Sequence, residues 1–308
     1  MASMPLITPI TEPRTIRSLL FATDFSPPSE RAMRYALAIA ARGKSKLFLV
    51  HVLSAKAAHS LTDLGVREFD PRRRETETQL RVLQNSGRLT GVDHSIIVER
   101  GGVWRVLAKL IEKNRIDLVV LGTRGRSGIP KLILGSVAEE VLRLAACPVL
   151  TIAPHVPEFK SGQTFRNILL ATDYLAGSLN AVPYGFCFAQ LFHAKVTFLH
   201  AIDATIVAGA VSREELQAQE RERLKTLVPG DVAAEVEFQA EFGPATDVIL
   251  AVAASKRADL IVMGAHATRA PAASTHLPWT VAHRVVCHAP CPVLTVREPR
   301  GSPNLSGT

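Results

Sequence analysis

The sequence of this chain contains an internal repeat, which restricts the folds that the chain can adopt. Two segments near the start of the chain return about halfway along it: "IRSLLFATDF" at 16–25 as "FRNILLATDY" at 165–174, and "KLFLVHVL" from Lys46 as "KVTFLHAI" from Lys195. Two later segments also return: "RIDLVVLG" at 115–122 as "RADLIVMG" at 257–264, and "CPVLTI" at 147–152 as "CPVLTV" at 291–296. Because the order is kept, we predict two copies of one domain, over residues 1–155 and 164–300, joined by a Pro-rich polar linker within 153–164.

Each copy alternates short apolar runs with longer stretches of helical period. The runs expected to be strands in the first copy are 19–22, 47–52, 95–98, 118–121 and 149–152. Their mostly continuous apolarity is typical of a parallel sheet that is covered on both faces. The predicted fold class is therefore α/β, with a doubly wound parallel-sheet domain in tandem.

Two stretches between the strands carry clear helix signals. For the first helix we expect Ser26 as the N-cap, Pro27 at the first helical position and Gly43 just past the end. In a later stretch, apolar residues follow i, i+3, i+4, i+7, i+8 spacing, namely Val103, Val106, Leu107, Leu110 and Ile111. That spacing predicts an apolar stripe that faces the sheet.

Composition excludes several classes of protein. Of 308 residues 47% are hydrophobic and 21% charged, no apolar run is long enough to span a membrane, and the first residues lack the pattern of a signal peptide. The four cysteines form no CxxC pair, so we expect reduced residues in a cytoplasmic protein. The net charge is +8, but the one tight basic run, 72–74, leads into Glu75 and Glu77, which favours a solvated helix face over a nucleic-acid patch.

The stretch "GTRGRSGIPKLILGS", residues 122–136, combines glycines and positive charge at the end of a predicted strand. Gly122 permits a positive φ and a close approach of backbone to a ligand. We expect Ser136 to be the N-cap of the next helix, whose N–H groups and dipole would favour a phosphate. Arg124 and Arg126 can add charge-assisted bonds. The stretch is thus a candidate phosphate cradle; alternatively, its glycines only make turns and its arginines are solvated.

The spacing of Gly122, Gly125, Gly135 and Ser136 resembles the ATP-binding motif of the universal stress protein family. The stretches "LLFATDFSPPSERAMRYALAIA", "LFLVHV" and "CPVLTI" resemble other parts of that family, and the likeness covers nearly all of the chain in two copies. The resemblance implies an adenine-nucleotide α-hydrolase-like fold, with five parallel strands in the order 3-2-1-4-5 in each copy.

The resemblance also implies which residues hold the nucleotide. Asp24 and the backbone near Val52 would contact adenine, with Ala22 and Thr23 lining the pocket. Ribose and phosphates would be held by Leu121, Gly122, Thr123, Arg124 and Gly125, with Arg126, and by Gly135, Ser136 and Val137. The ligand would be ATP, with or without Mg²⁺. An alternative for Asp24 is that it only caps the helix that follows.

The second copy departs from the motif. Gly264 and Thr280 match, but Ala267 and Trp279 replace the other two glycines, and Pro278 removes an N–H donor. We therefore expect one ATP per chain, bound by the first copy, while the second copy is structural or holds another ligand.

Four histidines gather near this loop, at 266, 276, 283 and 288, in no recognised metal-ligand spacing, so no metal site is assigned. Core packing is the expected role of Cys147 and Cys291.

Three functions remain open. The first is an ATP-binding, cytoplasmic stress-response regulator that is read by an unidentified protein partner. The second is an enzyme such as a slow ATPase, against which stands the lack of a Walker loop, a GxSxG elbow or an HExxH pair. The third is a nucleotide-independent scaffold for lipid or protein partners. We also expect the apolar last strands of the two copies to pair as an intrachain pseudo-dimer, or else in a homodimer.

Overall fold

The computed structural model describes residues 14–54, 71–124, 134–160, 162–203, 212–230, 232–265 and 281–297. The first half contains, in chain order, β1 (Ser18–Thr23), α1 (Pro27–Gly43), β2 (Lys46–Ser54), α3 (Pro71–Asn85), β3 (His94–Gly101), α4 (Val103–Lys113), β4 (Leu118–Gly122), α5 (Ser136–Leu144) and β5 (Val149–Ile152). The second half contains β6 (Asn167–Thr172), α6 (Ala176–Leu179), α7 (Val182–Phe192), β7 (Lys195–Ile202), α8 (Arg213–Lys225), β8 (Val236–Phe242), α9 (Ala245–Ser255), β9 (Leu260–Ala265), α10 (Val281–His288) and β10 (Val293–Arg297).

The strands of the first half lie where the apolar runs predict them, with ends that differ by a few residues. The expected stripe of α4 also forms, with Leu107, Leu110 and Ile111 buried. Ser26 caps α1, since its side chain accepts a bond from the Ser29 N–H, and Pro27 is the first helical residue. One expected helix end is wrong: Gly43 is the last residue of α1, and Lys44 takes the left-handed conformation, with φ of 50°.

The ten strands of the described residues form one sheet, in the order β3-β2-β1-β4-β5-β10-β9-β6-β7-β8. Within each half the neighbours are parallel, so each half has the predicted order 3-2-1-4-5. The order reverses between the first and fourth strands of each half. A doubly wound sheet opens a crevice for ligands at that point, beyond the carboxyl ends of its strands.

The two halves are joined through their last strands. β5 and β10 pair antiparallel, with Leu150 opposite Leu294 and Thr151 opposite Val293. This is the expected intrachain pairing, and it covers two apolar strands that would otherwise be sheet edges. Because each covers the other, a homodimer through the same strands would require this pair to open.

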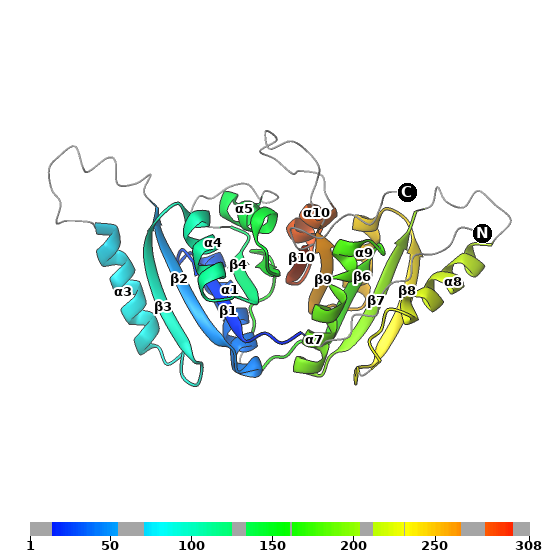
Figure 1. Cartoon of the computed structure of the whole chain (residues 1–308), viewed down its shortest axis with the longest axis horizontal. Helices are drawn as coiled ribbons and strands as arrows, with labels where there is room; N and C mark the ends of the chain where they lie inside the picture. The colour runs from blue at the N-terminus through cyan, green and yellow to red at the C-terminus, as the bar shows by residue number, and fades with distance from the viewer. Residues whose placement is uncertain are drawn as a thin grey trace.

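Helices cover both faces of the sheet, as Figure 1 shows. The core on one face includes residues of α1, α3, α7 and α8, and the core on the other includes residues of α4, α5, α9 and α10. α5 and α10 flank the junction of the halves, next to β5 and β10 (Figure 1). No helix among the described residues is long and apolar enough to cross a membrane.

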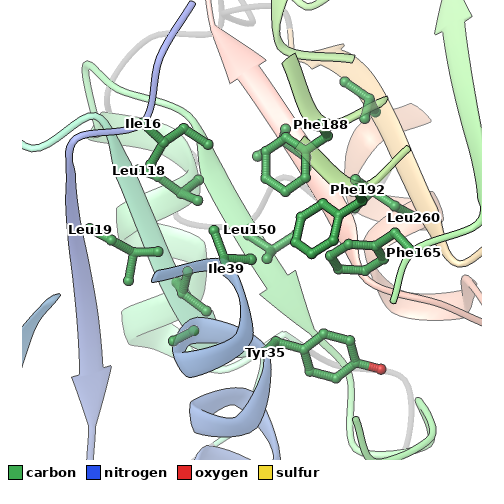
Figure 2. Close-up of a cluster of buried hydrophobic side chains, with 14 of the residues drawn as sticks. Ile16, Leu19, Tyr35, Ile39, Leu118, Leu150, Phe165, Phe188, Phe192 and Leu260 are labelled. Atoms are coloured by element: carbon green, nitrogen blue, oxygen red, sulfur yellow. The ribbon is translucent and has the colours of Figure 1, made fainter. Parts of the chain in front are cut away.

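The linker between the halves, together with Phe165 that follows it, is packed into the core. Phe159 and Phe165 are buried, and their rings lie with that of Tyr35 at centroid distances of 4.9 to 6.1 Å. Phe165 also meets Phe192 of α7 edge to face at 4.7 Å. Figure 2 shows Tyr35 from the first half and Phe165, Phe188 and Phe192 from the second within one cluster of side chains. The linker therefore joins the halves by apolar contact as well as by sequence.

Hydrogen bonds hold the same linker against α1. The Tyr35 hydroxyl donates to the Pro157 carbonyl at 2.8 Å, and Arg31 Nη1 donates to the Val156 carbonyl at 2.7 Å. These bonds satisfy carbonyl groups that lie outside helix and sheet. The polar, Pro-rich composition of the segment does not reveal this packing.

Candidate functional site

The structure brings the predicted residues of the first half to one edge of the sheet. Ala22 and Thr23 end β1, Val52 lies near the end of β2, Leu121 and Gly122 end β4, and Thr123 and Arg124 follow. Gly135, Ser136 and Val137 lie at the start of α5. Gly125 and Arg126 lie outside the described residues. The remaining residues come from four segments and meet at the carboxyl ends of parallel strands, where ligands bind in such sheets.

The turn after β1 is held by side chains of the predicted site. Thr23 Oγ1 accepts bonds from the Phe25 N–H at 3.0 Å and from the Ser29 hydroxyl at 2.8 Å. Asp24 Oδ1 accepts from the Ser26 N–H at 3.0 Å, which shapes the turn, while Ser26 itself caps α1. The N-cap of α1 is therefore Ser26, and not Asp24 as the alternative interpretation assumed. Asp24 positions Ser26 by accepting the bond from its N–H.

Two residues beside this turn were missed by the sequence reasoning. His51 Nδ1 donates to the Thr23 carbonyl at 2.8 Å, and the ring of Phe25 lies on the His51 ring at 5.0 Å between centroids. Phe25 has a φ of 57°, a left-handed conformation that is costly for a large side chain. The signal was present in the repeats, because each copy keeps an aromatic residue after the Asp and a His in its second strand.

The chain leaves β4 and returns to it at the start of α5. The Gly135 N–H donates to the Thr123 carbonyl at 2.8 Å, and the Gly135 carbonyl accepts the first helical bond from the Glu139 N–H at 2.9 Å. Gly135 is thus the N-cap, and the expectation that Ser136 caps the helix is wrong; Ser136 is exposed at the first helical position. Since Gly135 has no side chain, no capping side chain competes for the first-turn N–H groups of α5.

The glycines matter here because of close backbone contacts. A Cβ at Gly122 would lie 3.2 Å from the Pro28 carbonyl oxygen, and one at Gly135 would lie 3.1 Å from the Thr123 carbonyl oxygen. Gly135 has a φ of −65°, and Gly122 is not among the residues with positive φ, so the expected use of a positive φ is wrong. Both residues let segments of this protein approach each other closely, which is a structural role independent of any ligand.

Arg124 follows Thr123 and is near enough to the second half to affect a cysteine there. Burial raises the pKa of the Cys287 thiol in α10, and the nearby charge of Arg124 partly offsets that rise. Thr123 is buried and its N–H donates to the Ile152 carbonyl at 3.0 Å, so the backbone before Arg124 is fixed to β5. The Arg124 backbone also lies close to the start of α5, since a Cβ at Gly135 would lie 3.7 Å from Arg124 Cα.

The second half repeats the turn in detail. Thr172 Oγ1 accepts from the Tyr174 N–H at 3.0 Å, Asp173 Oδ1 accepts from the Leu175 N–H at 3.0 Å, and Tyr174 has a φ of 62°. His200 Nδ1 donates to the Thr172 carbonyl at 2.9 Å, with its ring 4.4 Å from that of Tyr174. The duplication thus extends to single hydrogen bonds, including a strained aromatic residue in both copies.

The two halves differ beyond that turn. α6 in the second half has four residues, and the backbone of its residue Ser178 lies against Gly264 of β9. A Cβ built on Gly264 would lie 2.5 Å from Ser178 Cα, much closer than the contacts of its counterpart Gly122. Ala267, Pro278, Trp279 and Thr280, which distinguish the second motif, lie outside the described residues.

A cavity of about 290 Å³ occupies the second half at the position equivalent to the predicted site. We call it the junction cavity, because both halves line it. Its second-half lining includes Thr172, Asp173, Ala201, Met263 and Gly264, the counterparts of Thr23, Asp24, Val52, Leu121 and Gly122. The first half contributes Leu134, just before α5, and Glu139, Leu142 and Arg143 of α5. The sequence repeats could locate the cavity residues of the second half, but not those that the first half contributes.

The histidines near the second motif do not gather into a described cluster. His266 and His276 lie outside the described residues. His288 Nδ1 donates to the Arg284 carbonyl at 2.8 Å, and burial lowers the pKa of His283, which lines the junction cavity. In the part of the chain that the structure describes, no group of three His, Cys, Asp or Glu residues is arranged to hold a metal.

Comparison with known proteins places this architecture. Two doubly wound units of strand order 3-2-1-4-5 in tandem define a protein of the adenine-nucleotide α-hydrolase-like fold. The chain belongs to the universal stress protein family, whose model matches residues 15–153 and again residues 164–297.

Individual relatives agree with the family assignment. A universal stress protein A homolog of Coxiella burnetii is 34% identical over 145 residues, which cover 44% of this chain and 95% of that protein. A universal stress protein of Methanocaldococcus jannaschii is 28% identical over 138 residues, or 44% of this chain and 81% of that protein. Each aligned region spans less than half of this chain, the length of about one of its two copies.

Solved structures match the whole tandem arrangement. A universal stress protein from Archaeoglobus fulgidus has a TM-score of 0.69 at 20% identity, covering 91% of this chain and 98% of its own. A putative universal stress protein from Pseudomonas aeruginosa has a TM-score of 0.59 at 19% identity, covering 92% and 93%. At these identities the likeness concerns the fold.

Proposed function

We propose that this protein is a cytoplasmic stress-response regulator that binds one adenine nucleotide, ATP with or without Mg²⁺, mainly in its first half. The nucleotide state would be read by a protein partner. In this proposal adenine and ribose lie against the ends of β1, β2 and β4, and the phosphates lie at the start of α5.

The observation that carries the proposal is the return of the chain from β4 to α5. The Gly135–Thr123 hydrogen bond of 2.8 Å brings the start of α5 against the end of β4, at the crevice of the sheet. The first-turn N–H groups of α5 have no capping side chain, and the positive end of a helix dipole stabilises an anion there. This arrangement suits a phosphate group.

Charge and polarity near α5 also support a nucleotide. Arg124 is the second residue after β4, and an arginine can give a phosphate two parallel bonds. The exposed hydroxyl of Ser136 is free of any capping bond within α5 and can donate to a phosphate oxygen. Asp24 directly follows β1, and the bond from the Ser26 N–H to its Oδ1 holds the carboxylate at the sheet edge proposed for adenine.

The second half supports the proposal by analogy and limits its stoichiometry. The same elements enclose the junction cavity there, so this part of the fold can hold a small molecule. In the second half, Ala267 and Trp279 replace two motif glycines and Pro278 removes an N–H donor. A triphosphate without its donors would bear an unrecovered desolvation cost. We therefore expect one ATP per chain.

Equilibrium titration of the full chain with ATP tests the proposal. Calorimetry should give one site per chain, and mass spectrometry of small molecules released from the purified protein by heat should detect an adenine nucleotide. Two equivalent sites would contradict the assignment to the first half, and no measurable binding of ATP, ADP or AMP would contradict the proposed function itself. Phosphate release, measured separately, decides whether bound ATP is hydrolysed.

A further inference from the structure

The junction cavity has walls that are mainly apolar. The first half contributes Leu142 of α5 and Leu134, which lies just before that helix. In the second half, β7, β9 and α10 contribute Leu199, Met263 and Val286. At about 290 Å³ it is close to the lower end of the range of small-molecule sites, roughly 300 to 1,000 Å³. Its size and lining fit a compact organic molecule better than water, which requires polar partners.

Two of the charged groups around the cavity, Asp173 and Arg297, are already bonded within the protein. Asp173 Oδ1 accepts bonds from the Leu175 N–H at 3.0 Å and from the Ser178 hydroxyl at 2.6 Å. Arg297 Nη1 donates to the carbonyl oxygens of Leu142, at 3.1 Å, and of Arg143, at the end of α5. A ligand that required Arg297 as its charge partner would have to break these bonds.

The charges of the described lining also oppose a phosphate-rich ligand. Two arginines, Arg143 and Arg297, are balanced by two carboxylates, Glu139 and Asp173. Arg143 and Glu139 lie on one helix, one turn apart. A triphosphate would therefore gain little net attraction and would lose its hydration, whereas an uncharged molecule would not bear that cost.

We propose that the junction cavity binds an uncharged, mainly apolar small molecule, and that this molecule contacts both halves of the chain. The second-half strands supply the floor of the site. α5, whose first turn belongs to the proposed nucleotide site, supplies a wall through Leu142. The second half is thus a binding site of different chemistry, rather than an empty remnant of a duplicated nucleotide site.

The test uses N-phenyl-1-naphthylamine, an uncharged apolar fluorophore, with the full chain. Its emission should rise to saturation at one molecule per chain. Ala201→Phe places a ring in the cavity from β7 and should reduce the affinity at least tenfold. The matched control is Val52→Phe at the equivalent position of β2, which should leave the fluorophore affinity unchanged. Absence of saturable binding by the parent chain, or equal losses in the two variants, would overturn the proposal.

A variant in the first half tests the shared wall. Leu142→Gln puts an amide on the α5 side of the cavity and should weaken fluorophore binding at least threefold, although Leu142 precedes the second half by many residues. Unchanged affinity would show that α5 does not contact the ligand. Circular dichroism and thermal unfolding accompany every variant, and Ile249→Phe, from α9, replaces Ala201→Phe if the latter does not fold.

Competition separates this proposal from the proposed nucleotide function. Saturating ATP should not displace the fluorophore, and Ala201→Phe should retain the ATP affinity of the parent chain. Displacement by ATP in a competitive manner would mean that the cavity is a nucleotide site, and would overturn the inference. Failure of ATP to bind anywhere, with fluorophore binding intact, would contradict the nucleotide proposal alone.

Discussion

The N–H of Gly135 donates a hydrogen bond of 2.8 Å to the carbonyl oxygen of Thr123. This bond sets the start of α5 directly beside the end of β4, although 11 residues separate Thr123 from Gly135 in sequence. It explains why a glycine stands at the N-cap, since a Cβ there would lie 3.1 Å from the same carbonyl oxygen. It also makes large substitutions at Gly135 poor tests of ligand binding, because they would disturb the backbone first.

Ser136 offers a cleaner test of phosphate binding. Ser136→Glu adds a negative charge at the exposed first position of α5, which favours the helix but repels a phosphate. We expect ATP affinity to fall at least about tenfold, or about 1.4 kcal/mol, with no loss of thermal stability. Ser136→Gln, of similar size without the charge, should cost much less affinity. Equal ATP affinities for the two variants, measured by calorimetry, would remove the phosphates from the start of α5.

Arg124 should discriminate between phosphorylated and unphosphorylated ligands. Arg124→Ala removes a charge-assisted bond, worth about 1.5 to 3 kcal/mol, and should weaken ATP by roughly 10- to 100-fold while adenosine affinity stays constant. Arg124→Lys keeps the charge but loses the paired bonds, so an intermediate affinity is expected. If Arg124→Ala weakens ATP and adenosine equally, the side chain serves the junction near Cys287 rather than a phosphate.

Equivalent glycines in the two halves should respond differently to the same substitution. Gly264→Ala places a Cβ 2.5 Å from Ser178 Cα, a backbone atom, whereas Gly122→Ala places one 3.2 Å from the Pro28 carbonyl oxygen. We expect Gly264→Ala to lower the free energy of unfolding by about 3 kcal/mol or more, and Gly122→Ala by about 1 kcal/mol. Denaturant unfolding of both variants measures the difference. A similar loss in both would mean that α6 moves freely away from β9.

Phe165, the residue that follows the linker, should contribute to the stability of both halves. It is 1% exposed and packs with Tyr35, Phe188 and Phe192 (Figure 2). Phe165→Ala should cost about 3 to 5 kcal/mol, since it leaves a cavity between the halves. The control Leu175→Ala, at a side chain that is 57% exposed, should change stability by less than about 0.5 kcal/mol. A small loss for Phe165→Ala would show that the halves are stable without the aromatic cluster.

Three of the four cysteines, the buried Cys291 and the partly buried Cys147 and Cys187, should be unreactive in the folded chain. Burial raises the pKa of Cys147 and Cys291 to about 12 and that of Cys187 to about 11, so all three stay protonated at neutral pH. Ellman's reagent at pH 8 should label them only after urea is added. Because the thiols ionise more easily in the unfolded chain, stability should be constant below pH 9 and fall as the pH rises from 9 towards 12. Rapid labelling of the native chain would contradict this burial.

Most of the fold follows from patterns that the sequence displays locally. The repeats define two copies, and apolar runs such as 118–121 and 149–152 define their strands, because a buried parallel strand needs apolar side chains on both faces. Ser26 and Pro27 mark the start of α1, because capping depends on residues within one turn. The predicted residues Asp24, Gly122 and Ser136 lie at one sheet edge because Asp24 follows a strand, Gly122 ends one and Ser136 starts a helix.

What the sequence could not reveal depends on contacts between residues far apart in the chain. Gly135, and not Ser136, caps α5, and its N–H is bonded to the Thr123 carbonyl. Phe165 packs against Tyr35 across the two halves, which the antiparallel pairing of β5 with β10 holds together. The junction cavity arises from the same pairing, which brings Leu142 of one half beside the strand ends of the other. The repeats and apolar runs are enough to define the two copies and the sheet edge at which each could bind a ligand. The shared lining of the junction cavity appears only in the tertiary structure, because its contacts join residues that no local pattern links.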